Sequence, residues 1–202
     1  MWKLFERKHS MRGGENLKVT KADKNRPLRV ATVFTSLSIG GDENRLLHYL
    51  THRDPEKFEH IVTVVLDISD EIEAASGGIR YRYAEQGVEI INLGELPFRS
   101  RRPLPKPLAG LRIGSTFALV IRRLARIFRE REIDVVDTRL SLGTLVGASA
   151  ARLAGIRAIV ATNYGKDHWD RFGWKLLGQC SFAMIDTLVC DSQARLSEME
   201  AW

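Results

Sequence analysis

A glycine-rich turn at residues 36–43 is the stretch of this sequence best suited to hold a ligand. It follows Leu28–Phe34, a short apolar run with β-branched residues that is typical of a buried strand. Gly40 and Gly41 give the backbone freedom in φ, and Asp42 is placed to cap the helix that follows. A strand, turn and helix in this order present free N–H groups and a positive helix end to a phosphate. A glycine pair that only turns the chain fits the same pattern.

Polar residues also follow two later strand-like runs. Arg139 comes after Ile133–Asp137, and Asn163 and Tyr164 come after Ala158–Ala161. Ligands of doubly wound sheets bind above the carboxyl ends of the strands, so we expect one contiguous cleft at this edge. The residues expected to line it are Ser38, Gly40, Gly41, Arg139, Asn163 and Tyr164.

Strand-like and helix-like stretches alternate along the chain. The further predicted strands are His60–Leu66, Val88–Leu93, Ile133–Asp137, Ala158–Ala161 and Thr187–Cys190. The predicted helices are one after the glycine turn, a short one within 70–87, Ser115–Glu132, Leu145–Ala154, Trp169–Met184 and Ala194–Trp202. The Pro- and Arg-rich segment Leu96–Gly110 is predicted to lack regular structure. Alternation of this kind predicts an α/β fold, a Rossmann-like parallel sheet wound on both faces with right-handed crossovers.

The length of 202 residues and the hydrophobic content of 44% suit one domain with an appendage. Residues 1–27 are polar, show no strand or helix period and end at a proline, so we expect a basic, flexible N-terminal arm. Residues 28–202 then form the Rossmann-like domain. No apolar run reaches about 18 residues and the N-terminal stretch has no apolar core for cleavage, which predicts a cytoplasmic location.

Positive charge is concentrated in two segments. Residues 1–27 carry eight Lys/Arg against three Asp/Glu, and residues 99–131 carry ten against one. Such asymmetry points to an acidic partner or, more simply, to a solvated surface. No helix-turn-helix or zinc pattern accompanies the charge, so we do not expect nucleic acid as the partner. We expect the basic segments to bind the inner face of an anionic membrane or a lipid-linked acceptor.

Two cofactor classes have little support in the sequence. Cys180 and Cys190 are the two cysteines, and their placement predicts buried thiols, with no disulfide framework and no metal site. Asp67, after the second strand, has the place of a ribose-binding acid, but the turn before it reads S-I-G-G-D-E and lacks G-x-G-x-x-G. We therefore expect no nicotinamide cofactor.

Three collinear motifs resemble one family. They are TSLSIGGDENRLLHYL, EIDVVDTRLSLGTLVGASAARLAGIRAIVAT and DTLVCDSQARLSEM. Together they look like the N-terminal, acceptor-side domain of glycosyltransferase family 4, which has a GT-B fold; the matching residues are the G-G-x-E turn at 40–43, the D-V-V strand at 134–136 and Ser192. The resemblance implies transfer of a sugar, with retention, from a UDP- or GDP-linked donor to a sugar or lipid-linked acceptor.

The same resemblance assigns site residues. Gly40 and Gly41 would approach the donor diphosphate, and Ser38, Arg139 and Asn163 would contact the acceptor. Where the family has a histidine in A-T-x-H-G, this chain has Tyr164, which can hydrogen-bond a sugar hydroxyl but does not titrate near neutral pH. His168 is placed to substitute for it from the loop, so Tyr164 and His168 are the catalytic candidates. The family's H-x-H is replaced here by Asp137-Thr138-Arg139.

Two interpretations follow from the resemblance. The chain is the acceptor half of a retaining glycosyltransferase that needs a donor domain in cis or as a partner chain. Alternatively, it is a noncatalytic Rossmann-like binding module that kept the scaffold. In either case we expect the chain alone to be inactive, because closure of the donor domain supplies donor contacts and excludes water.

Overall fold

The computed structural model describes residues 3–6, 26–37, 40–66, 70–75, 77–94, 106–163 and 174–190, with the single positions 192 and 197. Its strands are β1 (Lys3–Glu6), β2 (Leu28–Phe34), β3 (Phe58–Val64), β4 (Glu89–Asn92), β5 (Val135–Arg139), β6 (Ala158–Asn163) and β7 (Thr187–Cys190). Its helices are α1 (Gly41–His52), α2 (Asp70–Ala75), α3 (Ile79–Glu85), α4 (Lys106–Glu130), α5 (Leu140–Ala154) and α6 (Trp174–Ala183).

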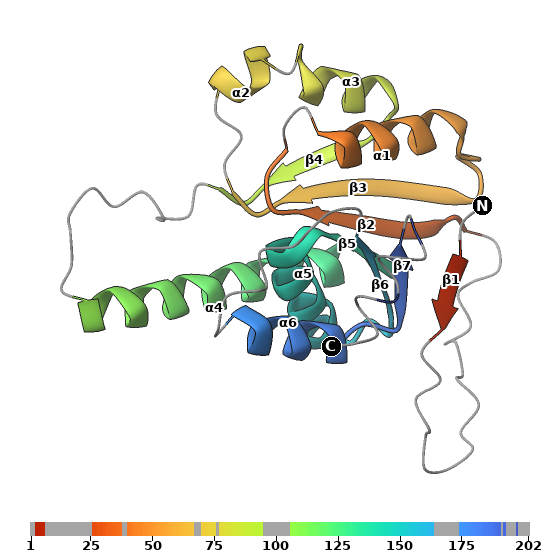
Figure 1. Cartoon of the computed structure of the whole chain (residues 1–202). Coiled ribbons are helices and arrows are strands. Elements are labelled where there is room, and N and C mark those ends of the chain that lie inside the picture. The colour runs from red at the N-terminus through yellow and green to blue at the C-terminus, as the bar shows by residue number, and fades with distance from the viewer. Residues whose placement is uncertain are drawn as a thin grey trace.

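The described strands form one sheet in the order β1-β7-β6-β5-β2-β3-β4. β2 to β7 are parallel, and β1 pairs antiparallel with β7 at the edge. Figure 1 shows α1, α2 and α3 on one face of the sheet and α4, α5 and α6 on the other. The predicted α/β Rossmann-like fold, a parallel sheet covered on both faces, is confirmed.

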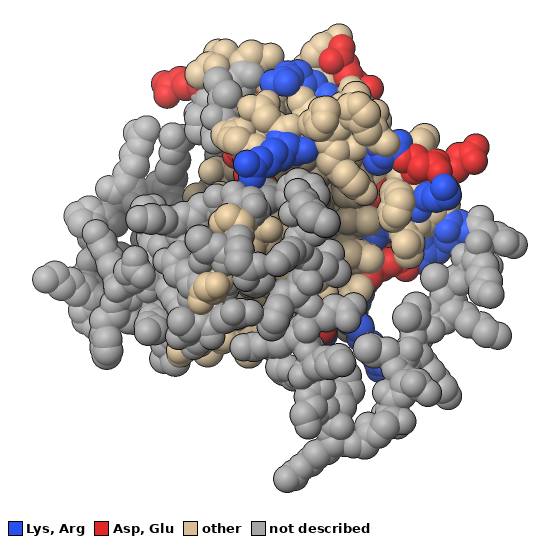
Figure 2. Space-filling view, turned by 45° about the vertical axis from the view of Figure 1, so that its right-hand side comes forward, with Lys and Arg blue, Asp and Glu red and all other residues tan. Residues whose placement is uncertain are grey.

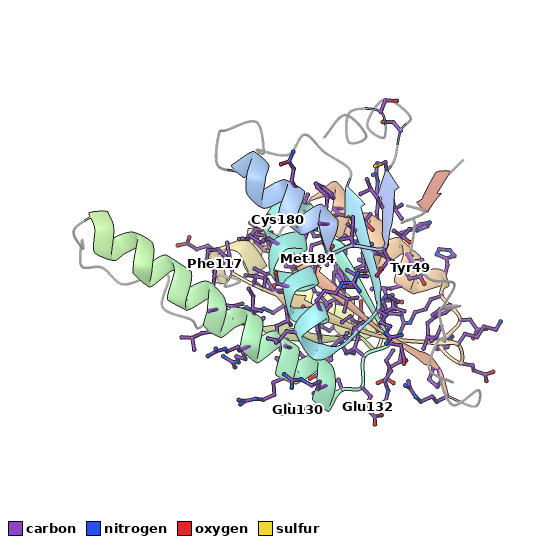
Figure 3. All side chains as sticks on the ribbon, turned by 90° about the horizontal axis from the view of Figure 1, so that it is seen from below. Tyr49, Phe117, Glu130, Glu132, Cys180 and Met184 are labelled. Atoms are coloured by element: carbon purple, nitrogen blue, oxygen red, sulfur yellow. The ribbon has the colours of Figure 1, made fainter. Side chains whose placement is uncertain are left out.

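Each face of the sheet has its own apolar core, because successive side chains of a strand point to opposite faces. Under α1 and α3 the core is built around Phe34, Val62, Val64 and Tyr83. Under α4, α5 and α6 it is built around Val33, Val136, Ile159 and Phe128. Figure 3 shows this second helix layer from below, with Phe117 on α4 and Met184 after α6, both of which pack against the core.

Two helices begin earlier than the sequence predicted. α4 begins at Lys106, inside the Pro-rich segment that was expected to be irregular. Pro107 is its second residue, where the missing N–H has no intrahelical partner to lose, so the proline does not oppose the helix. α5 begins at Leu140 rather than Leu145.

The N-terminal segment contains a strand that the sequence did not predict. Lys3–Glu6 forms β1, with Lys3 opposite Cys190 and Glu6 opposite Thr187. Four residues are too few for a period-2 pattern to stand out, and the pairing strand lies more than 180 residues away. The rest of the predicted flexible arm, up to residue 25, lies outside the described residues.

Two aspartates have the same architectural role at the starts of β5 and β7. The Asp134 carboxylate accepts the N–H of Arg29 at 2.9 Å, and the Asp134 N–H donates to the Arg29 carbonyl at 2.9 Å. Asp186 forms the same reciprocal pair with Ile159 on β6. Each aspartate thus forms the first pair of hydrogen bonds between its strand and the neighbouring one. The D-V-V motif therefore has a structural explanation that needs no ligand.

Asp134→Ala is expected to lower the free energy of unfolding by about 1–3 kcal/mol, because it leaves the Arg29 N–H and the bidentate Arg26 guanidinium without their acceptor. Urea unfolding measures the change. Glu130→Ala, at an exposed residue near the end of α4 (Figure 3), should stay within about 0.5 kcal/mol. Equal losses in the two variants would contradict the assigned role of Asp134.

None of the described helices is both long enough and apolar enough to cross a bilayer.

Candidate functional site

The strand order of the sheet reverses between β2 and β5. From β2 the chain moves through α1 to β3 on one side, and from β5 it moves through α5 to β6 on the other. The two crossover helices lie on opposite faces of the sheet (Figure 1), so the strand order reverses at the carboxyl ends of β2 and β5. This topological switch point is where open α/β sheets bind their ligands, and it is the candidate site of this chain.

A buried ion pair network lies at this switch point. Arg139, the last residue of β5, donates from Nη1 to Asp42 Oδ1 at 2.6 Å and from Nε to Asp137 Oδ2 at 2.8 Å. Its Nη2 lies 2.7 Å from the same Asp137 oxygen. The side chains of Arg139 and Asp42 are only 9% and 8% exposed. The guanidinium therefore ties the first turn of α1 to β5.

Side chains of the neighbouring strands β2 and β6 extend the ion pair network across the sheet. Asp137 is paired with Thr32 on β2, and Arg139 is paired with Thr162 on β6, so all four side chains point to the same face. Thr162 Oγ1 donates to Asp137 Oδ1 at 2.8 Å, and Thr32 Oγ1 lies 3.5 Å from Oδ2. Asp137 thus accepts from three neighbours in the middle of the sheet.

Asp42 does not cap α1, contrary to the expectation from the sequence. The N-cap is Gly40, in an extended conformation, and Asp42 is the second residue of the helix. Burial raises the pKa of the Asp42 carboxyl, and the Arg139 guanidinium offsets only part of that rise. Oδ2 of Asp42 is buried and has no hydrogen-bond partner among the described residues.

Glu43 and Tyr83 fix the same helix turn from its other side. The Glu43 carboxylate folds back over Gly40 and fills the space that a side chain at Gly40 would need. A glutamate at the third helical position commonly folds back in this way toward the N-cap. The buried Tyr83 hydroxyl donates to the Glu43 carbonyl at 2.8 Å, and burial raises the pKa of Tyr83.

The glycine pair serves other purposes than the predicted freedom in φ. Gly40 has φ −114°, and neither Gly40 nor Gly41 is in the left-handed region. Position 40 requires glycine for a steric reason, because a Cβ there would overlap the Glu43 carboxylate. Gly41 is exposed, with nothing within 4 Å of the position of a Cβ. Only Gly41 therefore leaves open space at the helix end.

Leu140, the residue after Arg139, has a strained backbone. Its φ is +59°, a conformation that bulky residues rarely adopt. Such outliers persist where the surroundings hold them, and they are frequent at ligand sites. The strain lies at the switch point, between the ion pair network and α5.

The charge around the first turn of α1 is negative. Asp42, Glu43 and Asp137 bring three carboxylates against two guanidinium groups, that of Arg139 and that of Arg82, which lies 3.5 Å from the Asn44 side-chain oxygen in the same helix turn. The partial positive charge of about half a unit at a helix N-terminus is smaller than this excess. Among the described residues, the site therefore favours hydroxyl groups that donate hydrogen bonds over a free phosphate.

The structure brings Gly40, Gly41 and Arg139 together at the switch point. The Asn163 backbone ends β6 at the same edge, but its side chain, and all of Ser38, Tyr164 and His168, lie outside the described residues. Their predicted roles remain predictions. Within the described part of the chain, no group of three or more His, Cys, Asp or Glu side chains is arranged to hold a metal ion.

The sequence prediction missed the roles of Asp42, Asp137 and Thr162 in this network. One signal was available, because Asp137 and Arg139 are two residues apart in a strand and therefore share a face. The partner Asp42 carried no such signal, since it is 97 residues away from Arg139 and meets it only through the strand order.

Comparison with solved structures supports the fold. No protein-family model matches the chain, and no curated protein matches it either. A UDP-N-acetylglucosamine 2-epimerase matches with a TM-score of 0.53 at 18% identity, covering 80% of this chain and 41% of its own. A protein described as the same epimerase from Listeria monocytogenes matches with a TM-score of 0.52 at 12% identity, covering 79% and 38%.

A third similar structure is the lipopolysaccharide outer core galactosyltransferase WaaB, with a TM-score of 0.41 at 16% identity, covering 66% of this chain and 32% of its own. This TM-score is too low to show a shared fold. The chain spans about two fifths of the length of the two epimerase structures. At these identities the likeness shows the Rossmann-like fold alone, and the activity has to be argued from the site.

Proposed function

We propose that this chain is the acceptor-side half of a retaining GT-B glycosyltransferase of family 4, which transfers a sugar from a UDP- or GDP-linked donor. The family motifs at residues 40–43, 134–136 and 192 support the family, and the likeness to sugar-nucleotide epimerases supports the fold. A donor domain, in cis or as a partner chain, completes the site.

The observation that carries the proposal is the ion pair network at the switch point. Asp42 and Arg139 are buried, and Asp137 is partly buried, at the edge where such sheets bind ligands. Their excess of carboxylate suits hydroxyl groups, the recognition chemistry of a sugar acceptor, better than a diphosphate. The acceptor therefore binds to this domain, and the donor diphosphate is bound mainly by the donor domain.

A sugar-nucleotide epimerase half is the second candidate, because the two matches with TM-scores above 0.5 are to proteins described as epimerases of UDP-N-acetylglucosamine. The two candidates differ in their products. Epimerisation inverts one carbon and keeps the UDP linkage, whereas transfer releases UDP. Chromatography of the products of a completed enzyme separates them.

The isolated chain is expected to bind donors weakly and to catalyse nothing. Calorimetric titration with UDP-N-acetylglucosamine, UDP-glucose and GDP-mannose should give dissociation constants of about 1 mM or weaker, since the carboxylates oppose the diphosphate and the donor half is missing. Micromolar affinity, or UDP release by the isolated chain, would overturn the division of roles between the halves.

Gly41→Val tests whether a ligand approaches the helix end. Since Gly41 is exposed, has open space and has no positive φ, valine should change the free energy of unfolding by less than about 1 kcal/mol. In the enzyme completed with a donor domain, it should lower transfer at least tenfold by blocking close backbone approach. Full transfer by a stable Gly41→Val enzyme would exclude Gly41 from the site.

We also propose that α4 attaches the domain to anionic membranes. Four arginines, Arg122, Arg123, Arg126 and Arg129, are exposed on one side of the helix, and Leu119 beside them is 54% exposed. The helix extends beyond the edge of the sheet (Figure 1). On the face drawn in Figure 2, by contrast, positive and negative side chains are interspersed over the described surface. Each Lys or Arg near an anionic surface contributes about 1 kcal/mol.

Sedimentation with vesicles tests the attachment. We expect binding to vesicles with 30% phosphatidylserine at 50 mM salt, its loss at 500 mM salt, and little binding to pure phosphatidylcholine. Replacing Arg122, Arg123 and Arg126 by Gln should reduce the bound fraction severalfold, whereas replacing Arg45, Arg80 and Arg82 near α1 and α3 should not. Equal binding to both kinds of vesicle would contradict the proposal.

A further inference from the structure

Two exposed histidines lie one turn apart on α1, away from the switch point. His48 and His52 are at i and i+4, so their side chains point to the same side of the helix. Their ring centroids are 4.5 Å apart and the ring planes are tilted by 55°. Asp42, at the other end of the helix, is six residues from His48, about 9 Å along the axis.

A backbone contact determines which nitrogen of His52 carries the proton. Nδ1 of His52 lies 2.9 Å from the carbonyl oxygen of His48. A carbonyl oxygen only accepts, so Nδ1 must be the N–H donor, and in the neutral ring the lone pair is on Nε2. Histidines that bind metals are held in the same way, with one nitrogen donating to a carbonyl or carboxylate and the other left for the metal.

We propose that His48 and His52 form a surface site for a divalent transition-metal ion. Imidazole nitrogens suit Zn²⁺, Ni²⁺ and Cu²⁺, and two histidines four residues apart on a helix are the spacing by which H-E-x-x-H proteins supply two zinc ligands. A centroid separation of 4.5 Å is short enough for rotation of the rings to bring one nitrogen of each to the same ion, at the usual metal–nitrogen distance of about 2.0–2.1 Å. No third His, Cys, Asp or Glu of the described chain joins them, so water fills the remaining positions.

The charges around His48 and His52 determine how tightly and how selectively the site should bind a metal ion. Arg45 is exposed one turn before His48, and its charge opposes a cation, whereas the Arg53 guanidinium is turned away to the carbonyls of Leu50 and Gln86. Two neutral ligands and one nearby positive charge give a weaker site than a three-ligand zinc centre. The affinity should follow the general order for nitrogen ligands, with Cu²⁺ above Ni²⁺ and Zn²⁺.

The third described histidine cannot replace either ligand. His60, on β3, is buried, and burial lowers its pKa to about 4. Its ring and that of Tyr49 on α1 meet edge to face, with their centroids 5.7 Å apart. Tyr49 is labelled in Figure 3. The site is therefore confined to the two exposed rings.

Copper titration of the untagged full chain tests the proposal. Electron paramagnetic resonance with one equivalent of Cu²⁺ should show hyperfine splitting from two imidazole nitrogens, and either His48→Gln or His52→Gln should reduce it to one and weaken binding about tenfold or more. His9→Gln is the matched control and should change neither result. A wild-type signal in both α1 variants would overturn the site.

Zn²⁺ provides a second measurement that does not depend on copper chemistry. Binding to the folded chain raises the melting temperature according to the ratio of free metal to its dissociation constant. We expect a rise with 1 mM Zn²⁺ that EDTA reverses and that both α1 variants lose while their metal-free melting temperatures remain unchanged. No rise in the wild type, or a rise that survives both substitutions, would contradict the proposal.

Discussion

Arg139→Met is expected to lower the free energy of unfolding by about 3–5 kcal/mol, because it leaves Asp42 and Asp137 as buried carboxylates without a positive partner. Both acids are largely buried, and one oxygen of Asp42 has no hydrogen-bond partner among the described residues. Removing one member of a buried pair costs far more than removing a surface pair, whose typical contribution is below about 1 kcal/mol.

The matched control is Arg126→Met, the same substitution on the exposed side of α4, which should stay within about 0.5 kcal/mol. Urea unfolding followed by circular dichroism measures both variants. A second variant, Arg139→Met with Asp42→Asn, should recover part of the loss, because one of the two uncompensated charges is gone. A loss of less than about 1 kcal/mol in the single variant would show that the network does not stabilise the fold.

The pH dependence of this effect has a defined sign. Burial raises the pKa of Asp42 in the folded state above its usual value of 3.8, so the folded chain binds more protons than the unfolded chain just above that value. Asp42 therefore contributes stability when protonated and loses it as the pH rises through its folded pKa. Without Arg139 that pKa rises further. The loss in Arg139→Met should accordingly become smaller as the pH is lowered toward the folded pKa of Asp42.

Gly143→Ala is expected to lower the free energy of unfolding by about 1–3 kcal/mol, toward the upper end of that range. A Cβ at Gly143 would lie 2.9 Å from the Val33 carbonyl oxygen and 3.4 Å from the Thr35 nitrogen. These are backbone atoms of β2 and of the residues just after it, which cannot rotate away as a side chain can. The Gly143 N–H also donates to Thr35 Oγ1 at 3.0 Å, so any shift of α5 strains that bond.

Gly41→Ala is the control, since it places the same methyl group in the first turn of α1 with no atom within 4 Å. It should leave the free energy of unfolding unchanged or raise it by up to about 1 kcal/mol, as alanine has the higher helix propensity. Gly147→Ala should resemble Gly143→Ala, with its Cβ 2.7 Å from the Thr138 methyl. Comparable thermal stability of Gly143→Ala and Gly41→Ala would contradict the close packing of α5 on β2.

The strands could be predicted from the sequence because each is a short apolar run with turn residues on both sides. The bounds of β2 and β7 match the prediction, and β3 to β6 are displaced by only a few residues. The start of α5 could not be predicted, because it begins at Leu140 with a positive φ and carries serine, glycine and threonine in its first turn. Residues of that kind predict a loop on local grounds, and here packing against β2 prevails.

The structure places Gly40, Gly41 and Arg139 of the predicted cleft at one edge of the sheet, but neither glycine has a positive φ. The position of the edge follows from alternation alone, since all parallel strands end on the same side. The roles of Gly40 and Arg139 depend on contacts with Glu43 and Asp42, and these contacts require the three-dimensional path of α1. Local pattern therefore predicted which edge of the sheet these residues share, while the charge around them emerged only from tertiary packing.

The pairing of β1 with β7 bears on the order in which the chain becomes structured during synthesis. Lys3–Glu6 leaves the ribosome more than 180 residues before its partner Thr187–Cys190, which is the last described strand. β2 can pair with β3 once the chain up to Val64 has emerged, whereas β1 can pair with β7 only after the chain up to Cys190 has emerged. Contacts of such long sequence separation form late, because the connecting segment must be closed first. Until then, β1 has no partner strand in this sheet.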